Sequence, residues 1–222
     1  MRLLDLFCGA GGCSVGYARA GFDVVGVDIE PHPDYPFPFV QDDAMAILGR
    51  TPFLSTFDVI HASPPCPRYS VAGSIGSYDP STKPDLVGPV REALQAWGGT
   101  YVMENVPGAP MPDAVTLCGW AMGLTHIKRH RLFESNVFLM APGCACPKGD
   151  TVSVFGHSGE DRRKATIAQH GAMRKHVPFA EVRSLMGVDW MTSRDDVSDA
   201  IPPAYTQFVG EQMLHALLPA AH

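Results

Sequence analysis

An apolar run that stops abruptly at two prolines constrains this chain more than any other feature. Val59-Ile-His-Ala62 is typical of a buried strand in a parallel sheet, and Ser63 leads directly into Pro64-Pro65. Proline lacks the amide hydrogen that a sheet ladder needs and restricts φ, so the chain must turn rigidly here. Ligands of open α/β sheets bind at the carboxyl ends of the strands. Cys66, the next residue, is therefore a candidate nucleophile, and the alternative is an inert, half-buried thiol.

The first 21 residues have the pattern strand, glycine turn, helix. Arg2-Leu-Leu-Asp-Leu-Phe7 predicts a buried strand, Cys8-Gly-Ala-Gly-Gly12 a turn, and the helical pattern after it ends at Gly21. This unit opens many nucleotide-binding α/β folds, and its glycines permit positive φ and close approach of a ligand. The turn matches neither G-x-G-x-x-G nor a phosphate-binding loop, so a tight turn without a ligand is the alternative.

Acidic residues follow the next two predicted strands. Residues 23–28 form a short apolar strand pattern that ends in Asp28, about 20 residues after the glycine turn, where a carboxylate can accept hydrogen bonds from ribose hydroxyls. The alternative role of Asp28 is to cap the segment that follows. Phe39-Val40 predicts a third strand, and Gln41-Asp42-Asp43 forms its polar end. Glycine and two acids at three successive strand ends predict a pocket for an adenosine-like group.

A second proline-terminated strand carries buried polar residues. Thr100-Tyr-Val-Met-Glu-Asn-Val106 stops at Pro107, with Glu104 and Asn105 at its carboxyl end. Polar groups there are costly unless they are paired or functional, so we expect Glu104 to lie near Cys66. Further on, Arg129 and Arg131 lie on the same face of a predicted strand. Two adjacent guanidinium groups favour an anion or a carboxylate, and the alternative is a solvated edge strand.

Composition restricts the class of protein. The chain has 222 residues, 45% of them hydrophobic and 18% charged, which predicts one soluble globular domain, with room for a small appended lobe. We expect no membrane span and no signal peptide, because no run of 18 apolar residues exists and Asp5 interrupts the first apolar run. Six scattered cysteines fit reduced cytosolic thiols. A net charge of −6 argues against an indiscriminate nucleic-acid binder.

Helical patterns cover residues 44–48, 85–97, 179–186 and 203–218, whereas two other segments have no hydrophobic period. Residues 70–84 are small, polar and glycine-bearing, and we expect a loop that closes beside Cys66. Residues 136–178 predict a small inserted lobe with a basic face. The lobe's positive charge comes from Arg162, Arg163, Lys164, Arg174 and Lys175. Cys144-Ala-Cys146 and His157 suggest zinc, but C-x-C without a second pair is a poor zinc spacing, so no metal is expected.

Taken together, these stretches resemble the motifs of the DNA cytosine-C5 methyltransferases, in the order of that family. The matching stretches are residues 5–12, Asp28, Asp42-Asp43 with Asp43 favoured, residues 63–66, 104–106, 129–131, 179–187 and 200–205. The resemblance covers roughly residues 1–135 and 179–215. Eight motifs in the right order are a strong signal, although any one of them alone is weak. In size and style the chain resembles small, phage-encoded members of the family.

The resemblance implies an α/β, Rossmann-like fold of the S-adenosylmethionine-dependent methyltransferases, with a mostly parallel sheet and helices on both faces. Residues 1–135 and 179–222 would form the catalytic domain and residues 136–178 a small target-recognition lobe. The implied cofactor is S-adenosylmethionine, which leaves as S-adenosylhomocysteine, and the implied partner is double-stranded DNA. We expect a monomer that is cytoplasmic and has no contact with a membrane. If a phage encodes the protein, it would work in the cytoplasm of the bacterial host. Its expected role is phage DNA modification or restriction-modification.

The resemblance also assigns roles to individual residues. The implied catalytic residues are Cys66, Glu104, Arg129 and Arg131. The implied cofactor-binding residues are Phe7, Gly9, Gly11, Gly12, Asp28, Ile29, Asp43 and Pro64. The implied substrate-binding residues are Ser63, Pro65, Ser70 and Asn105, with Arg162, Arg163 and Lys164 of the basic lobe. In this family's chemistry the thiolate adds to C6 of a flipped-out cytosine, the carboxyl group holds N3, and C5 takes the methyl group.

The chain departs from the family pattern in three places, and the first and the third concern sequence specificity. Pro67 follows the cysteine where glutamine is common, Ile127 stands where glutamine often precedes the arginine pair, and the recognition region is short. Two rival functions therefore stay open. One is a methyltransferase that acts on a free cytosine nucleotide or on RNA. Duplex DNA affinity that does not depend on salt concentration would favour this alternative. The other is an inactive homologue that only binds DNA, against which the intact Cys66 and Glu104 count.

Overall fold

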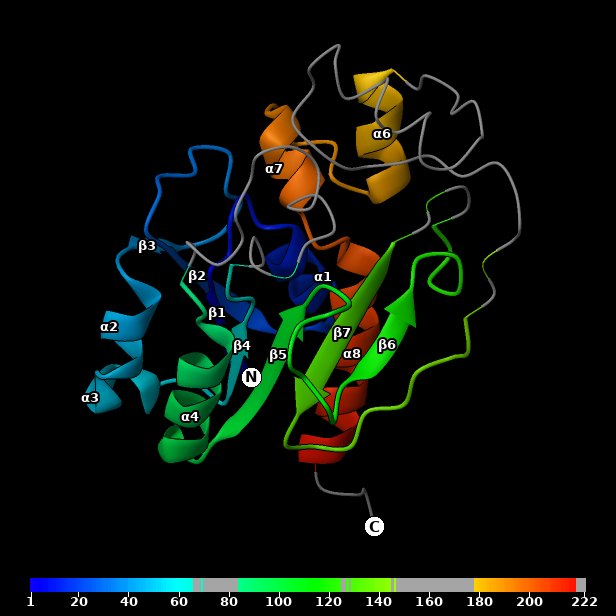
Figure 1. The fold of residues 1–222 in the computed structure, drawn as a ribbon. Coiled ribbons are helices and arrows are strands. Elements are labelled where there is room, and N and C mark those ends of the chain that lie inside the picture. The colour runs from blue at the N-terminus through cyan, green and yellow to red at the C-terminus, as the bar shows by residue number, and fades with distance from the viewer. Residues whose placement is uncertain are drawn as a thin grey trace.

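A computed structural model describes residues 1–65, 69, 84–124, 127, 129–144, 146 and 178–218. Its centre is a seven-stranded sheet with the order β3-β2-β1-β4-β5-β7-β6 (Figure 1). Strands β1 to β5 are parallel, whereas β7 is antiparallel to both β5 and β6. The strands are β1 (Arg2–Leu6), β2 (Asp23–Asp28), β3 (Phe39–Gln41), β4 (Val59–Ala62), β5 (Thr100–Asn105), β6 (Val115–Cys118) and β7 (His130–Ser135).

The order of the strands reverses between β1 and β4. From β1 the chain runs outward through β2 to β3, and it then returns to the other side of β1 as β4. Ligands of open α/β sheets bind at such a switch point, outside the carboxyl ends of the strands. The glycine turn follows β1 and the two prolines follow β4, so the topology places both sequence features at this edge.

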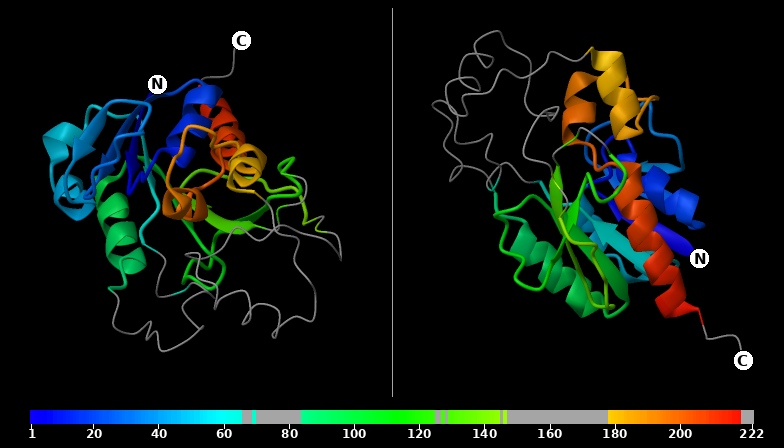
Figure 2. Two further views of the ribbon diagram at one scale, coloured as in Figure 1. Left: turned by 90° about the horizontal axis from the view of Figure 1, so that it is seen from above. Right: turned by 90° about the vertical axis from the view of Figure 1, so that its right-hand side faces the viewer.

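Helices cover both faces of the sheet, as the sequence predicts. On one face lie α2 (Ala44–Leu48), α3 (Thr51–Leu54) and α4 (Val87–Trp97), and on the other lie α1 (Gly12–Ala20) and α8 (Pro203–Leu217) (Figure 2). Helices α1 and α8 pack so closely that only glycine fits at position 16. A Cβ atom there would lie 2.0 Å from the Thr206 hydroxyl. That hydroxyl donates to the carbonyl of Cys13, which fixes α8 against α1.

The strands of the centre are buried on both faces, and side chains alternate between two apolar clusters. Leu4, Ile60 and Met103 pack under α2, α3 and α4, whereas the residues that precede them, Leu3, Val59 and Val102, pack under α1 and α8. Continuous apolar runs in β1, β4 and β5 follow from this two-sided burial. The second face also carries Asp5, His61 and Glu104, three polar side chains within the core.

Local signals place most element ends where the sequence predicts them. Gly21, Gly98 and Gly187 end α1, α4 and α6 (Phe179–Met186) in the left-handed conformation that glycine accepts most easily. Helix α3, strand β6 and helix α7 (Arg194–Asp199) are additions that the sequence pattern did not predict, since each has only four to six residues. No helix within the described residues is long and apolar enough to cross a membrane.

The segment with α6 and α7 lies beyond the carboxyl ends of the parallel strands (Figure 1). A small apolar cluster joins it to the glycine turn and to the loop before β7. The cluster consists of Ala10, Ile127, Met186, Val188, Met191, Val197 and Ala200. Its burial explains why Ile127 is apolar at a position where the family often has glutamine. Pro67, the other departure, lies outside the described residues.

Candidate active site

The glycine turn after β1 is held by the acid at the end of β2. The Gly9 amide donates a hydrogen bond to Oδ2 of Asp28 over 2.9 Å. Phe7 has φ of 61° and Gly9 has φ of 50°, so the chain turns sharply out of the strand. Positive φ is uncommon for a bulky residue, and such strain concentrates at ligand sites. Phe7, Gly9 and Asp28, all assigned to the cofactor from the sequence, are therefore close neighbours.

The three glycines of this turn are needed for different physical reasons. Among the residues that the structure describes, a Cβ atom on Gly9 would meet nothing within 4 Å, so this residue faces open space there. A Cβ atom on Gly11 would lie 2.9 Å from Pro36, and one on Gly12 would lie 2.5 Å from the Ile201 carbonyl. Packing within the protein accounts for Gly11 and Gly12, and Gly9 alone of the three leaves room for a ligand.

The ends of β2 and β3 carry the remaining predicted cofactor residues. Asp28 also accepts from the Glu30 amide over 3.1 Å, so it serves the turn after β2, as the alternative interpretation holds. The neighbouring Ile29 is 62% exposed, which is unusual for a large aliphatic side chain at the end of a buried strand. Asp43 caps α2 through one oxygen, Oδ1, whereas Asp42 is engaged by Arg50 at 2.7 Å. Asp43 therefore keeps one carboxylate oxygen outside these hydrogen bonds, which favours Asp43 over Asp42 as the residue that would bind the cofactor.

The turn after β4 is tied to the end of β5. The Asn105 side-chain amide donates to the Pro64 carbonyl over 2.9 Å, and its oxygen accepts from the Val106 amide over 2.9 Å. Asn105 is 1% exposed, so both hydrogen bonds lie in the protein interior. Ser63 is within 3.4 Å of the Phe7 carbonyl, and Pro65 is exposed. Asn105 therefore holds the turn that leads into Cys66. Cys66 and Ser70 lie outside the described residues.

A buried ion pair lies at the end of β5. Nε of Arg131 is 2.8 Å from Oε1 of Glu104, and both side chains are less than 10% exposed. Glu104 is opposite Phe133 in the antiparallel register, so Arg131 is its diagonal neighbour on the same face. Burial raises the pKa of Glu104, while Arg131 and Arg129 act to lower it, and the net shift is upward. A carboxyl group in this environment can hold a proton nearer to neutral pH than an exposed one.

Arg129 has a different environment from Arg131. Its Nη2 donates to the carbonyls of Ser198 and Ala200 over 2.7 and 2.8 Å, and its side chain is 1% exposed. Burial, together with the charge of the neighbouring Arg131, lowers the pKa of Arg129 to about 9. The interpretation of a solvated edge strand is wrong, because β7 lies between β5 and β6 and both guanidinium groups are buried. The hydrogen bonds of Arg129 join the start of β7 to the end of α7.

Sequence reasoning missed a buried polar group behind the glycine turn. Ser14 donates to Asp5, and because that uses its hydrogen, the Tyr35 hydroxyl donates to Ser14 over 2.7 Å. Beside them the Tyr17 hydroxyl is 2.9 Å from Nδ1 of His61. Burial raises the pKa of Asp5 to about 7 and lowers that of His61 to about 3. The available signal was an acid and a histidine inside otherwise apolar strands.

The C-terminal segment also reaches this edge of the sheet. The Trp190 indole donates to the Ala10 carbonyl over 2.9 Å, and the Thr192 hydroxyl donates to Asp34 over 2.7 Å. The C-terminal segment therefore packs against the glycine turn, although Trp190 and Ala10 are 180 positions apart in the chain. Of the predicted basic lobe, Arg162, Arg163, Lys164, Arg174 and Lys175 lie outside the described residues. Leu139, from the first part of the segment assigned to the lobe, is buried in the cluster under α8.

Comparisons with known proteins identify a family and a shared fold. Residues 1–115 match the family model of the C-5 cytosine-specific DNA methylases. The type II methyltransferase M1.HphI of Haemophilus parahaemolyticus is 38% identical in an alignment of 88 residues, and the match covers 34% of this chain and 24% of that protein. M.AquIA of a Picosynechococcus species is 32% identical in an alignment of 126 residues, and the match covers 48% of this chain and 49% of that protein. The matches thus span between a quarter and a half of these two relatives.

Two solved structures share the fold over nearly the whole chain. One is described as a candidate DNA modification methyltransferase encoded within an E. coli prophage. It has a TM-score of 0.60 and 15% identity, and the alignment covers 98% of this chain and 99% of that one. The other is the Dnmt2 methyltransferase of S. pombe, with a TM-score of 0.56, 12% identity and the same coverage. At this identity the likeness concerns the fold alone. Because the family model covers more than half of its residues, the chain belongs to the C-5 cytosine-specific DNA methylase family.

Proposed function

We propose that this protein transfers a methyl group from S-adenosylmethionine to C5 of cytosine in double-stranded DNA. The observation that carries the proposal is the buried Glu104–Arg131 pair beside the Asn105–Pro64 hydrogen bond. Together they place a carboxyl group with a raised pKa next to the turn that leads into Cys66, at the edge of the sheet where ligands of this fold bind.

The residues at the ends of β1, β2 and β3 fit S-adenosylmethionine. Gly9 faces open space, Asp28 presents a carboxylate at the end of β2, and the exposed Ile29 offers an apolar surface for a planar base. Asp43 has an oxygen, Oδ2, beyond the one that caps α2. These residues would hold the adenosine part of the cofactor. When bound, S-adenosylmethionine supplies an electrophilic methyl group.

Cys66 and Glu104 would perform the chemistry on the base. Cytosine C5 is a poor nucleophile, so the Cys66 thiolate first adds to C6 and forms a carbon–sulfur bond. Glu104 donates its proton to N3, which neutralises the negative charge that the addition creates on the ring. C5 then takes the methyl group and loses its proton to solvent. Departure of the Cys66 thiolate from C6 restores the aromatic ring, and N3 returns its proton to Glu104. The target base must leave the duplex stack to reach these groups.

Three other residues would position these groups. Arg131 holds the Glu104 carboxyl group, and Asn105 holds the turn before Cys66. Arg129 fastens the start of β7 to the end of α7, so that the C-terminal segment stays over the glycine turn. Arg162, Arg163 and Lys164 of the basic lobe would contact DNA phosphates, and Ser70 with its loop would cover the flipped base.

A covalent trap tests the proposal. Duplex DNA with 5-fluorocytosine cannot lose a proton from C5, so the enzyme with its methyl donor should remain attached to the DNA through Cys66. Cys66→Ser should abolish both this adduct and the methylation of unmodified duplex. Labelled methyl transfer to duplex DNA, RNA and cytidine nucleotides, followed by nucleoside analysis, identifies the substrate. Transfer to RNA or nucleotides alone, or an adduct on another cysteine, would contradict the proposal.

A matched pair of glutamate variants separates catalysis from folding. Glu104→Gln should reduce the methylation rate by about a hundredfold or more, since an amide cannot donate its proton as a carboxyl group does. Glu134 is also buried, and it pairs with Arg91 of α4 at 2.6 Å. Because Glu134 lies opposite Met103, on the other face of the sheet, Glu134→Gln should cost stability and leave the rate per folded molecule unchanged.

A further inference from the structure

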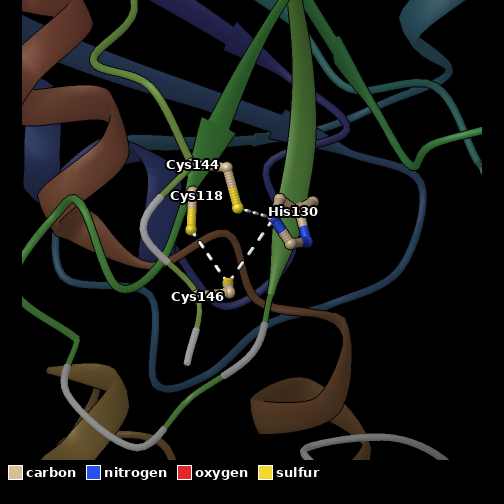
Figure 3. A group of neighbouring side chains, drawn as sticks. All are labelled: Cys118, His130, Cys144 and Cys146. Atoms are coloured by element: carbon tan, nitrogen blue, oxygen red, sulfur yellow. Dashed lines mark hydrogen bonds between the residues drawn. The ribbon is translucent and has the colours of Figure 1, made fainter. Parts of the chain in front are cut away.

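Three cysteines and one histidine meet at the far end of the sheet from β3. Figure 3 shows the side chains of Cys118, His130, Cys144 and Cys146 pointing toward one another. One ligand atom from each, three sulfurs and one imidazole nitrogen, lies within 4.8 Å of all the others. The four residues come from three separate stretches of the chain, so local sequence does not explain their meeting.

The register of the sheet brings the first two residues together. Cys118 is the last residue of β6 and His130 the first of β7, and the antiparallel ladder makes them direct partners. The Gly119 amide donates to the Arg129 carbonyl over 2.8 Å and continues the pairing past them. Side chains of directly opposed residues project to the same face. A thiol and an imidazole therefore stand side by side at the edge of the sheet that carries the candidate active site.

The chain after β7 returns over this pair with the other two residues. Cys144 and Cys146 are two residues apart, the spacing that places both side chains on one side of an extended segment. Nε2 of His130 is 3.2 Å from Sγ of Cys144 and 3.7 Å from Sγ of Cys146. The sulfurs of Cys118 and Cys146 are 3.2 Å apart. All five cysteines within the described residues are free thiols, so no disulfide accounts for these short distances.

These separations match a tetrahedral metal site. A zinc ion binds thiolate sulfur at about 2.3 Å and imidazole nitrogen at about 2.0 Å, so its ligand atoms lie roughly 3.5–3.8 Å apart. Occupation would require the Cys118 and Cys146 sulfurs to separate by about half an ångström.

We propose that Cys118, His130, Cys144 and Cys146 bind one zinc ion as a structural site. Three thiolates and an imidazole are a preferred zinc set, and with all four positions filled by the protein no coordination position remains for a substrate. The sequence pattern argued against zinc because C-x-C lacked a second pair. The fold provides that pair from β6 and β7, in place of His157, which lies outside the described residues.

The site would anchor the entrance to the recognition region. Cys146 directly precedes residues 147–177, and His130 stands between Arg129 and Arg131 in the chain. A bound ion would tie this entrance to the strand that holds Glu104 in place. The methyl transfer proposed above does not involve the ion, so the role of the site is to fix one element against another.

Metal analysis of the purified protein tests the site. Protein made in zinc-containing medium and purified without chelator should hold about one zinc ion per chain, measured by mass spectrometry of the elements. Cobalt added to the chelator-treated protein should give the intense visible bands of tetrahedral cobalt, with thiolate charge transfer in the near ultraviolet. Re-adding zinc should remove these bands and raise the melting temperature of the wild-type protein.

Variants identify the ligands. Cys144 is exposed, so Cys144→Ser should fold, and together with Cys146→Ser it should lose the bound zinc and the cobalt spectrum. Cys13→Ser is the matched control, since Cys13 is buried in α1 beneath α8 and should leave one zinc ion in place. Wild-type protein that neither contains zinc nor gives cobalt bands would overturn the proposal. So would zinc retention by the double variant, or a Cys118–Cys146 disulfide in freshly purified protein.

Discussion

Arg131 and Glu104 form a buried ion pair across two antiparallel strands, with Nε of the arginine 2.8 Å from the carboxylate. The two residues are diagonal neighbours in the ladder between β5 and β7. Burial raises the pKa of the carboxyl group and the guanidinium group lowers it, so the pair sets the pH at which Glu104 carries a proton.

Replacing Arg131 should therefore shift a pH profile. In Arg131→Met the pKa of Glu104 should rise further, because burial remains and the nearest positive charge is lost. Activity that needs the protonated carboxyl group falls as the pH rises through this pKa, so the alkaline limb of kcat/KM attributable to Glu104 should move to higher pH. Arg131→Lys should restore most of the wild-type profile. An unchanged limb in Arg131→Met would show that this pair does not govern catalysis.

Asn105→Asp should slow the chemical step while sparing cofactor affinity. Aspartate keeps the acceptor for the Val106 amide and loses the donor to the Pro64 carbonyl, which would free the turn before Cys66. The lost hydrogen bond costs about 1–3 kcal/mol. Asn136→Asp is the matched control, since Asn136 makes equivalent hydrogen bonds to Tyr101 and Gly99 at the other end of β5. Equal rates of 5-fluorocytosine adduct formation in both variants would contradict the prediction.

Asp28→Ala should weaken S-adenosylmethionine binding at least about tenfold in calorimetry, since it removes a charge-assisted acceptor and also releases the Gly9 amide. Asp23→Ala at the other end of β2 is the control. Within the described part of the chain, the Asp23 carboxylate pairs only with Arg2, at 3.7 Å on the exposed surface, so the cofactor should bind that variant normally. Wild-type affinity in Asp28→Ala would remove Asp28 from the site.

Asp5 should make stability depend on pH. Its pKa is about 7 in the folded protein, raised by burial, against 3.8 for an ordinary aspartate, so folding favours the protonated form. The contribution of Asp5 to the free energy of unfolding should be greatest below about pH 4. It should fall by an amount on the order of 4 kcal/mol as the pH rises to about 7. Asp5→Asn, which stays neutral, should lack this slope in urea denaturation. Equal slopes in both proteins would show that Asp5 is ionised in the core.

Neutralising Arg162, Arg163 and Lys164 together should weaken duplex binding and reduce its salt dependence. Each phosphate contact that is lost should lower the slope of log affinity against log salt by about one unit. Cofactor affinity should not change, since the residues proposed to hold the cofactor's adenosine part lie at the ends of β1 to β3. Wild-type DNA affinity at every salt concentration would assign the basic segment another role.

Much of the fold follows from signals that act over a few residues. Proline at 64 and 107, and glycine at 21, 98 and 187, end strands and helices through backbone geometry alone. Apolar runs with buried faces therefore predicted five parallel strands and five helices near their observed places. The order of motifs predicted the family, which the family model confirms. These features need no knowledge of distant contacts.

The tertiary structure decided what depends on pairing between distant residues. The register of β7 against β5 set Arg131 on Glu104 and buried Arg129 against Ser198 and Ala200, so two similar arginines acquired different partners. The register of β6 against β7 joined Cys118 to His130, and the returning chain added Cys144 and Cys146. A one-residue shift in either register would send every side chain of the strand to the opposite face. Such a choice rests on the packing of the whole sheet, which no short stretch of sequence contains.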